Sequence, residues 1–276
     1  MVDGHRIELV RHHAPAALGG LVAGIVGMSE RAPGVVRRRQ PAGSLVPLVF
    51  SFGSRLRVDA LAGDGRADRE YGSFLAGFST GPASTSFERS QDCVQVYLTP
   101  LGVERILGIP GMQAARSVLD LDDIDPALGG STSDRLHAAT TWRHRFDIVE
   151  TLLLDRASRT ADPPGWLPWM WGQIHASGGQ ARIADLVSAT GWSHRHVTSR
   201  FAEHVGVTPK QASSVVRFER ASLDLGRLPL AEIAARHGYS DQSHFTRDAG
   251  RFAGETPQEH AAAQRPTAVT ALGATY

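Results

Sequence analysis

Short apolar runs typical of β-strands fill the first third of the chain. They lie at residues 35–36, 45–52, 56–58, 74–78 and 93–98, separated by turns rich in glycine and proline. In the last run, Val94, Val96 and Leu98 share one face of an alternating pattern. This spacing predicts a small β-sandwich or barrel.

Helical patterning begins at Pro100. We expect helices over residues 101–107, 133–141 and 145–158. The third helix carries a stripe at helical spacing, made of Phe146, Val149, Leu152, Leu153 and Arg156. Two interpretations are open: the stripe packs on the β-rich domain, or it forms a dimerisation face.

The sequence changes character at the Asp-Pro-Pro-Gly segment of residues 162–165. From there to about residue 263 the pattern is almost entirely helical. A chain of 276 residues is long enough for two domains. We therefore predict an α+β protein with a β-rich domain over residues 1–161, an all-α domain over 162–265 and a flexible tail over 266–276.

Two segments of the helical half share one design. In each, an apolar residue precedes a glycine by five positions, and an aromatic residue and a serine follow that glycine. The shared positions are Leu186, Gly191, Trp192 and Ser193 in the first segment, and Ile233, Gly238, Tyr239 and Ser240 in the second. A duplicated pattern in register is much harder to obtain by chance than one such segment.

Each shared residue type has a structural role. The glycine adopts the conformation that ends one helix, and the aromatic ring fills the corner between two helices. The serine caps the second helix, which stabilises it by about 1 kcal/mol. Together they predict two helix-turn-helix units, in which the second helix of each enters the DNA major groove.

Longer stretches of the sequence resemble the AraC/XylS-type DNA-binding domain. They are GWSHRHVTSRFAEHVGVTPK (191–210), VRFERA (216–221), LAEIAARHGYSDQSHFTR (230–247) and AGETP (253–257). Upstream, the strings RRRQPAGS, FLAGF, YLTPLGVERILGIP and TWRHRFDIVETLLLDR resemble the amino-terminal sensor half of many actinobacterial members. The carboxy-terminal resemblance is specific and covers about 85 residues essentially without gaps.

The resemblance implies a cytoplasmic transcription regulator that is not an enzyme. Residues 1–161 would form a sensor or dimerisation domain, and a linker helix over about 209–225 would join the two helix-turn-helix units. The implied partners are double-stranded promoter DNA, a small-molecule effector and a second copy of the chain, with RNA polymerase added if the protein is an activator. We expect no cofactor, no metal and no membrane partner, and the sequence assigns no ligand-binding residues.

The polar faces of the two recognition helices supply the expected DNA-binding residues. Val197, Phe201 and Phe245 should be core anchors, because they share the apolar sides of their helices. The outward residues are His194, Arg195, Thr198, Ser199 and Arg200 in the first helix, and Gln242, Ser243, Thr246 and Arg247 in the second. The alternative for any one of them is a solvated helix residue.

Individual roles follow from side-chain chemistry. Arg195 can pair with guanine through two hydrogen bonds, and Gln242 suits adenine. Arg247 suits a phosphate or guanine, whereas Arg200 is expected to make a phosphate or structural contact. These assignments are predictions about the bound state.

The second unit differs at two positions from the family that the sequence resembles. Ala249 stands where the family has a large hydrophobic residue, and Gly250 stands where it has a basic or polar one. Glycine lowers helix stability by about 1 kcal/mol relative to alanine. We therefore expect looser packing in the second unit, and the family's frequent terminal arginine is replaced by alanines at 261–263.

Charge is unevenly placed although the whole chain carries only +1. Residues 195–220 contain five lysines or arginines and two acids, whereas residues 241–251 contain two of each. The first unit is therefore expected to attract phosphates more strongly. With 11 bases and 10 acids over residues 162–265, one copy should bind DNA weakly by charge alone, and occupancy should depend on base contacts and a second protomer.

Other chemistry receives less support from the sequence. The lone Cys93 fits a reducing cytosol and a buried small side chain, with a redox sensor as the alternative. The histidine pairs 12–13 and 194/196 lack further ligands at useful spacing. The acidic run 120–125 is expected to be a solvated turn and N-cap, and the arginines 37–39 either bind an anion or cover a surface.

Two further questions concern export and rival functions. The apolar stretch 14–28 is expected to be a folded segment, because it contains Pro15 and four glycines and is too short to span a bilayer. A cupin-like metal enzyme fused to a DNA-binding domain is one rival, and residues 35–98 contain no histidine for its site. A regulator that binds no ligand and acts through a protein partner is another.

Overall fold

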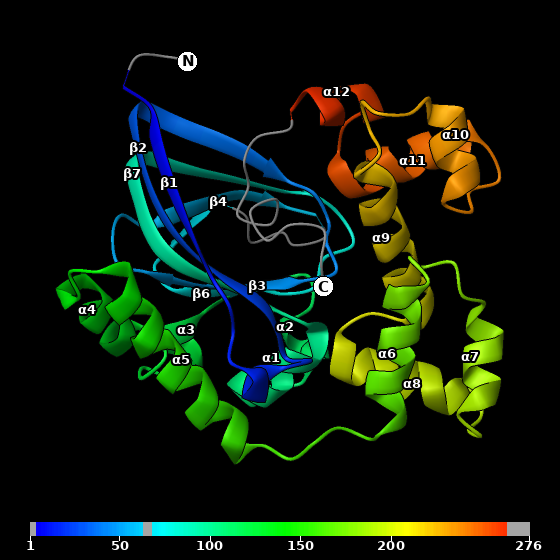
Figure 1. Ribbon diagram of the computed structural model, residues 1–276, viewed down its shortest axis with the longest axis horizontal. Coiled ribbons are helices and arrows are strands. Elements are labelled where there is room, and N and C mark those ends of the chain that lie inside the picture. Colours follow the sequence, from blue (N-terminus) through cyan, green and yellow to red (C-terminus); the bar gives the residue numbers. More distant parts are fainter. Residues whose placement is uncertain (1–3, 63–67, 264–276) are drawn as a thin grey trace.

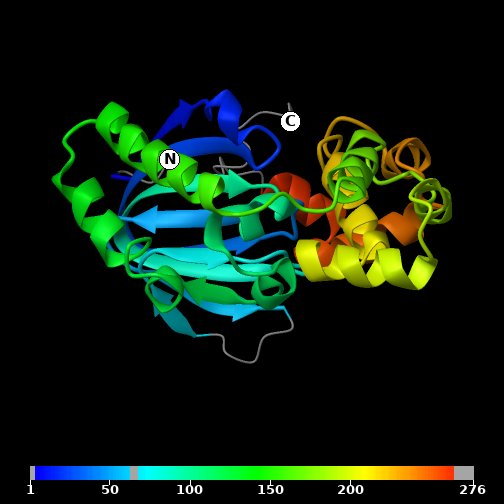
Figure 2. The ribbon, with the colours of Figure 1, turned by 90° about the horizontal axis from the view of Figure 1, so that it is seen from below.

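A β-rich part and a helical part stand side by side in the computed structural model (Figures 1 and 2). The structure describes residues 4–62 and 68–263, so the expected tail over 266–276 lies outside it. Among the described residues, no helix combines the length and apolar character that crossing a membrane requires. The predicted α+β class, with strands first and helices afterwards, is confirmed.

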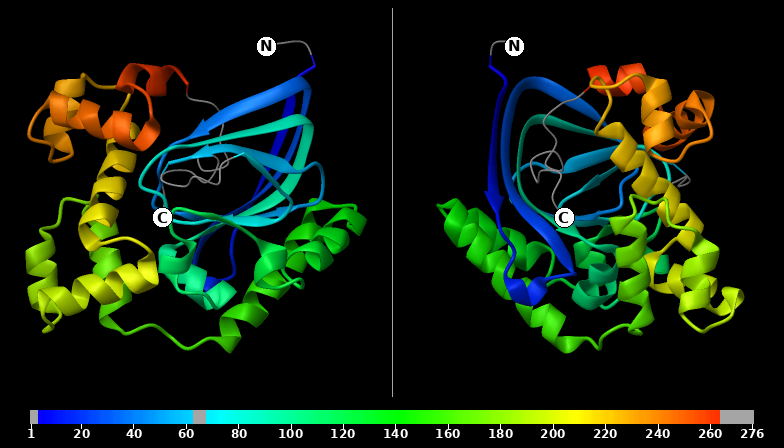
Figure 3. Two further views of the ribbon diagram at one scale, coloured as in Figure 1. Left: turned by 180° about the vertical axis from the view of Figure 1, so that it is seen from behind. Right: turned by 45° about the vertical axis from the view of Figure 1, so that its right-hand side comes forward.

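Over its described residues, the β-rich part is built on one antiparallel eight-stranded sheet. Its strands are β1 (Arg6–His12), β2 (Val22–Gln40), β3 (Val46–Ser51), β4 (Leu56–Leu61), β5 (Arg69–Tyr71), β6 (Phe74–Ala76), β7 (Ala83–Leu98) and β8 (Val118–Asp120). The order is β1-β2-β7-β3-β6-β8, and β4 pairs with both β7 and β5. The sheet curves strongly, and its long strands β2 and β7 form its centre (Figure 3).

The first strand and most of β2 are absent from the sequence prediction. The stretch 14–28 is folded as expected, and it contributes the short 3-10 helix η1 (Ala16–Leu18) and the start of β2. Its glycines obscure the strand pattern, yet Gly27 has a packing role. A Cβ at this position would lie 2.5 Å from the Trp142 ring, so only glycine lets the helix approach the strand so closely.

Five helices follow β7 on the chain, with the short strand β8 between the second and the third of them. They are α1 (Pro100–Leu107), α2 (Gly111–Ala114), α3 (Leu121–Ile124), α4 (Gly130–Ala138) and α5 (Trp142–Arg159). On α5, Phe146, Val149 and Leu153 are buried, and Phe146 stacks on His12 of β1. The packing interpretation of the α5 stripe is therefore confirmed, and dimerisation stays a prediction.

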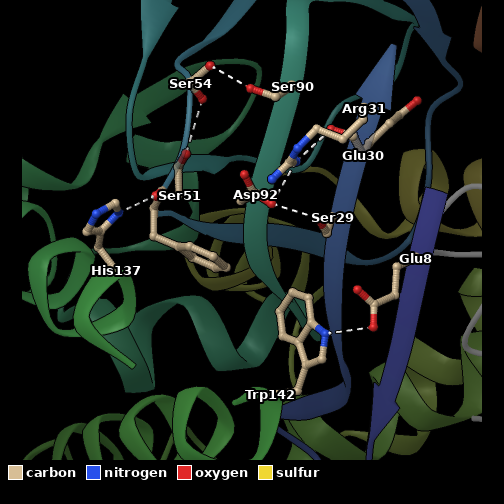
Figure 4. Close-up of polar contacts among 11 residues, drawn as sticks. Glu8, Ser29, Glu30, Arg31, Ser51, Ser54, Ser90, Asp92, His137 and Trp142 are labelled. Carbon is tan, nitrogen blue, oxygen red and sulfur yellow. Dashed lines mark hydrogen bonds and ion pairs between the residues drawn. The ribbon is translucent and has the colours of Figure 1, made fainter. Parts of the chain in front are cut away.

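Polar contacts connect the strands to one another and to the start of helix α5 (Figure 4). On β7, Asp92 accepts hydrogen bonds from Ser29 Oγ at 2.7 Å and from Arg31 Nη1 at 2.9 Å. The indole of Trp142 donates to Glu8 Oε1 at 3.1 Å. These contacts tie β1, β2, β7 and the start of α5 into one unit.

The burial of Cys93 and the N-cap in the acidic run are confirmed, whereas the solvated turn expected over residues 120–125 is instead the short helix α3, with Asp120 buried. Cys93 is fully buried, and burial raises the pKa of its thiol to about 12, so the thiolate that redox chemistry needs is disfavoured. In the acidic run, Asp120 caps α3 by accepting from the amide of Asp122 at 3.1 Å.

Up to residue 263, where the description ends, the carboxy-terminal part consists of seven helices. They are α6 (Trp166–Ala176), α7 (Ile183–Ala189), α8 (His194–Val205), α9 (Pro209–Ser222), α10 (Leu230–Arg236), α11 (Gln242–Ala253) and α12 (Pro257–Ala262). Helix α9 joins the lower group of helices to the upper one in Figure 1. A capping box between Thr208 and Gln211 fixes its start. Four fully buried rings, Phe201, Phe218, Phe245 and Phe252, lie in the core of this part.

Candidate nucleic-acid interface

The first helix-turn-helix unit consists of α7 and α8. Between them, Gly191 has a φ of +74°, a conformation that residues with a side chain rarely adopt. Ser193 then caps α8 by accepting from the amide of His196 at 3.3 Å. Both predicted roles are confirmed.

The second unit consists of α10 and α11 and corrects one assignment. Gly238 has a φ of +70°, as its turn role predicts. Ser240, however, does not cap the helix, because α11 begins one residue later than the pattern predicts. Asp241 is the cap, and its Oδ1 accepts from the amide of His244 at 2.7 Å. Ser240 Oγ donates instead to Asp241 Oδ2 at 3.2 Å.

The two turn aromatics have different surroundings. Tyr239 is 5% exposed, and its ring centroid lies 5.3 Å from that of Phe245, so it fills the helix corner as predicted. Trp192 is 55% exposed, and the same prediction is wrong for it. Val197 and Phe201 of α8 are fully buried, whereas the indole of Trp192 stays at the surface.

Most of the nine predicted DNA-binding side chains are exposed. Val197, Phe201 and Phe245 are fully buried, which confirms the apolar faces of the two helices. The exposed group comprises His194, Arg195, Ser199, Arg200, Gln242, Ser243 and Arg247, and the half-buried pair comprises Thr198 and Thr246. The structure therefore brings the predicted residues onto the outward faces of α8 and α11.

Several of these polar groups already have partners within their own helix. Arg200 pairs with Glu203 at 2.8 Å, so its guanidinium is partly neutralised. The Nε of Arg247 donates to the carbonyl of Ser243 at 3.3 Å. The hydrogen bond from the His244 amide lowers the pKa of the Asp241 carboxyl, which keeps a negative charge at the start of α11.

The charge count over residues 195–220 overstates the positive surface of the first unit. Arg217 is half-buried and donates to the carbonyl of Gly179 at 3.0 Å, which ties α9 to the turn before α7. Its guanidinium also lies 5.6 Å from the centre of the Tyr239 ring. A count of charged residues in the sequence could not reveal that Arg217 points inward, because such a count does not say where each side chain lies.

The second unit shows no loosening in its burial. Ala249 is fully buried together with Phe245, Phe252 and Ala253. Helix α11 also continues through Gly250, where a Cβ would meet open space. The looser packing that the sequence predicts for this unit is therefore not seen in the burial of its core.

The carboxy-terminal ends of both recognition helices contact the β-rich part, and their amino-terminal ends point away from it (Figures 1 and 3). At the end of α8, Nδ1 of His204 hydrogen-bonds with Oε2 of Glu104 on α1. Helix α2 also packs there, where a Cβ at Gly111 would lie only 2.0 Å from the carbonyl oxygen of His204. The predicted reading residues lie near the opposite ends of the two helices.

The end of β2 and the turn after it form the second contact. The amide of Ala42 donates to the carbonyl of Phe252 at 2.8 Å, and Arg39 Nη1 donates to that of Gly254 at 2.8 Å. Next to them, Glu219 of α9 lies against Gly43, and burial raises the pKa of its carboxyl. We call residues 39–44 the β2 clamp, because they touch both α9 and the end of α11.

The arginines 37–39 therefore have separate environments. Arg38 forms an ion pair with the fully buried Glu30 and lies over the Phe87 ring. Arg39 belongs to the β2 clamp, whereas Arg37 lines an open surface groove of about 860 Å³. No group of three or more histidine, cysteine, aspartate or glutamate side chains suited to a metal ion occurs in the described ranges.

Two capped helix-turn-helix units on one linker helix define a bipartite helix-turn-helix domain, a class that binds DNA. Residues 186–263 match the family described as "Helix-turn-helix domain". This carboxy-terminal region is an AraC-type helix-turn-helix domain, as its sequence predicts.

Curated relatives match within the same region. An uncharacterized HTH-type transcriptional regulator of Staphylococcus aureus (strain MRSA252) is 31% identical over 80 residues, which is 28% of this chain and 11% of that protein. The HTH-type regulator YbfI of Bacillus subtilis is 36% identical over 65 residues, or 23% of each chain. The match thus spans about a tenth of the Staphylococcus protein and about a quarter of YbfI.

Similar solved structures extend over more of the chain at lower identity. One structure of ToxT from Vibrio cholerae is 8% identical with a TM-score of 0.48, covering 94% of this chain and 98% of ToxT. The xylose-binding transcription activator XylR is 19% identical with a TM-score of 0.33, covering 44% of this chain and 38% of XylR.

Proposed function

We propose that this protein is a sequence-specific, DNA-binding transcription regulator. The observation that carries the proposal is the pair of recognition helices, α8 and α11, held on the single helix α9 with their predicted reading faces exposed. Two helices on a rigid spacer suit successive major-groove turns on one face of DNA, about 34 Å apart.

Side-chain chemistry assigns some residues of the two helices to base contacts and others to phosphate contacts. Arg195 reads guanine and Gln242 reads adenine through paired hydrogen bonds. His194, Thr198, Ser199, Ser243 and Thr246 are the neighbouring polar contacts. Arg200 and Arg247 contact phosphates, and Arg200 leaves its partner Glu203 to do so.

Electrostatic attraction alone gives one copy only modest affinity. The acidic cap Asp241 and the inward Arg217 reduce the positive field at the DNA face. A homodimer that places four recognition helices on one promoter compensates for this, because linked sites raise the effective concentration of the second copy.

The β-rich domain, residues 1–161, senses a small molecule and controls the DNA-binding domain over residues 162–265. Regulation acts through the β2 clamp and the contact between Glu104 and His204, since these join the two domains near the recognition helices. An effector that binds one arrangement of the domains more tightly shifts the population toward it.

The remaining parts of the proposal concern location and partners. The protein acts in the cytoplasm on promoter DNA, without a cofactor, metal or enzymatic activity, and contacts RNA polymerase if it is an activator. The matched relatives are named as transcriptional regulators, which supports this class. A ligand-independent regulator and a cupin-like metal enzyme fused to the domain are the alternatives.

Footprinting of the purified full chain on the region upstream of its own gene, and on duplexes selected from a random pool, tests the proposal. We expect protection of two adjacent major-groove segments on one DNA face. Arg195→Ala should abolish protection of one segment. Arg143→Ala, an exposed arginine of α5, is the matched control and should leave the footprint intact. Absence of specific protection at low salt would refute the function.

A further inference from the structure

Trp192 is an exposed aromatic residue at the entrance to the first recognition helix. Its side chain is 55% exposed, whereas the protein buries the corresponding Tyr239 of the second unit to 5%. The same glycine-aromatic-serine pattern thus places one ring in the core and the other at the surface. Exposing an indole sacrifices the free energy that its burial would contribute, so a structural role does not explain this residue.

The exposed ring is nevertheless held in place. It stacks on the imidazole of His196, with ring centroids 4.7 Å apart and planes 26° from parallel. The amide of Trp192 donates to Thr190 Oγ1 at 3.2 Å, and that hydroxyl donates to the carbonyl of Val187 at 2.7 Å. A ring oriented in advance loses little conformational entropy when a partner covers it.

The surroundings of the ring suit a polyanion. Residues 190–202 contain two arginines, Arg195 and Arg200, and two histidines, His194 and His196, and they contain no acidic residue. The ring lies immediately before Ser193, the cap of α8, and is therefore continuous with the predicted reading face. Trp192 precedes this cap, and its ring stacks on His196 in the first turn of α8, so it lies next to the end of α8 that the proposed function places in the groove.

We infer that Trp192, supported by His196, is a positioning contact to the sugar-phosphate backbone at the rim of that groove. This inference rests on the proposed DNA-binding function. The indole Nε1–H donates to a phosphate oxygen, and the ring face covers the adjacent deoxyribose. Such a contact fixes the depth and angle of α8 in the groove without reading a base.

A comparison of variants of the full chain tests the inference. Trp192→Ala and Trp192→Phe are compared with Trp169→Ala, which removes a 39% exposed indole from α6. Binding is measured by fluorescence anisotropy with a selected duplex and with an unrelated duplex at low salt. Trp192→Ala should weaken binding to both duplexes by a similar factor of roughly five to twenty, as expected for a backbone contact.

Four further results are expected, three from the same binding measurements and one from fluorescence quenching. The salt dependence should not change, because no charge is removed. Trp192→Phe, which keeps a ring but lacks the N–H donor, should be intermediate, and Trp169→Ala should bind within about twofold of the wild type. DNA should also protect the wild type from acrylamide quenching more than it protects Trp192→Phe.

Each contrary result has a distinct meaning. Wild-type binding by Trp192→Ala, with Arg195→Ala weakened, would overturn the inference and leave the proposed function intact. A loss confined to the selected duplex would make Trp192 a base reader and would also overturn it. Absence of binding by the wild type to either duplex would refute the proposed function itself. Far-UV circular dichroism checks that each weakened variant is folded. If Trp192→Ala does not fold, the comparison of Trp192→Phe with the wild type still tests the contact.

Discussion

The carbonyl oxygen of Phe252, near the end of the second recognition helix, accepts a 2.8 Å hydrogen bond from the amide of Ala42 after strand β2. These residues are far apart in sequence, and each belongs to a different part of the protein. The bond makes the position of α11 depend on the β-rich domain. The second recognition helix is thus bound to the β-rich domain through Ala42, and the first is bound to the same domain through the contact of His204 with Glu104 on α1.

Removing the Arg39 side chain should loosen the β2 clamp. Arg39→Ala loses the hydrogen bond to Gly254 and the 3.6 Å ion pair with Glu255, so α11 and α12 should exchange amide hydrogens faster. Hydrogen-exchange mass spectrometry measures this. Arg89→Ala removes an exposed arginine of β7 and should leave both helices unchanged. Equal exchange in the two variants would show that Arg39 does not hold the domains together.

The Glu219 carboxyl should make stability depend on pH. Burial raises its pKa in the folded state, so its protonated form is favoured there, and the associated stability is present at low pH and lost as the pH rises through the folded pKa. Glu219→Gln should therefore gain stability relative to the wild type at pH 7 to 8 and gain least near pH 4. Thermal unfolding across this range measures the difference. A uniform loss of stability in Glu219→Gln would contradict the assignment.

The cap of α11 should reside in Asp241 and not in Ser240. Asp241→Ala loses the bond to the His244 amide and should lower the free energy of unfolding by about 1 kcal/mol. Ser240→Ala should cost clearly less, since its hydroxyl contacts only side chains. Urea denaturation compares the two variants. The reverse order of losses would restore the serine as the cap.

Gly250 should lower the stability of helix α11, and replacing it by alanine should restore that stability. Gly250→Ala places a methyl group in open space on a continuous helix and should stabilise the protein by about 0.5–1 kcal/mol. Gly111→Ala is the informative contrast, because its Cβ would overlap the carbonyl of His204 and force α2 and α8 apart. Thermal and urea unfolding should shift in opposite directions for the two variants. Destabilisation by Gly250→Ala would mean that this turn of α11 is strained.

The first unit should contribute more to DNA binding than the second. Both arginines are exposed, but Arg247 lies near the carboxyl of Asp241, the cap of its helix, whose pKa is lowered. Arg195→Ala should therefore lower affinity for a selected duplex more than Arg247→Ala, by roughly tenfold or more against a smaller loss. Anisotropy titrations at two salt concentrations measure both. A far larger loss from Arg247→Ala would reverse the ranking.

The sequence by itself determined the local design of the helical half. A glycine at positive φ and a capping side chain act within one turn of the chain, so Gly191, Ser193 and Gly238 carry their structural meaning in their own neighbourhood. The apolar spacing of α8 and α11 likewise identifies Phe201 and Phe245 as buried anchors. These features need no knowledge of what packs against them.

Only the tertiary structure decided which surfaces meet. Strand β1 pairs with β2 across a glycine-rich stretch whose close packing needs α5, more than a hundred residues later. Identical patterns placed Tyr239 inside and Trp192 outside, because the space beneath each ring depends on neighbouring helices. Three successive arginines likewise reached a groove, a buried carboxylate and the DNA-binding domain. Burial, ion pairing and domain contact depend on residues distant in sequence, and local patterning contains no information about those distances.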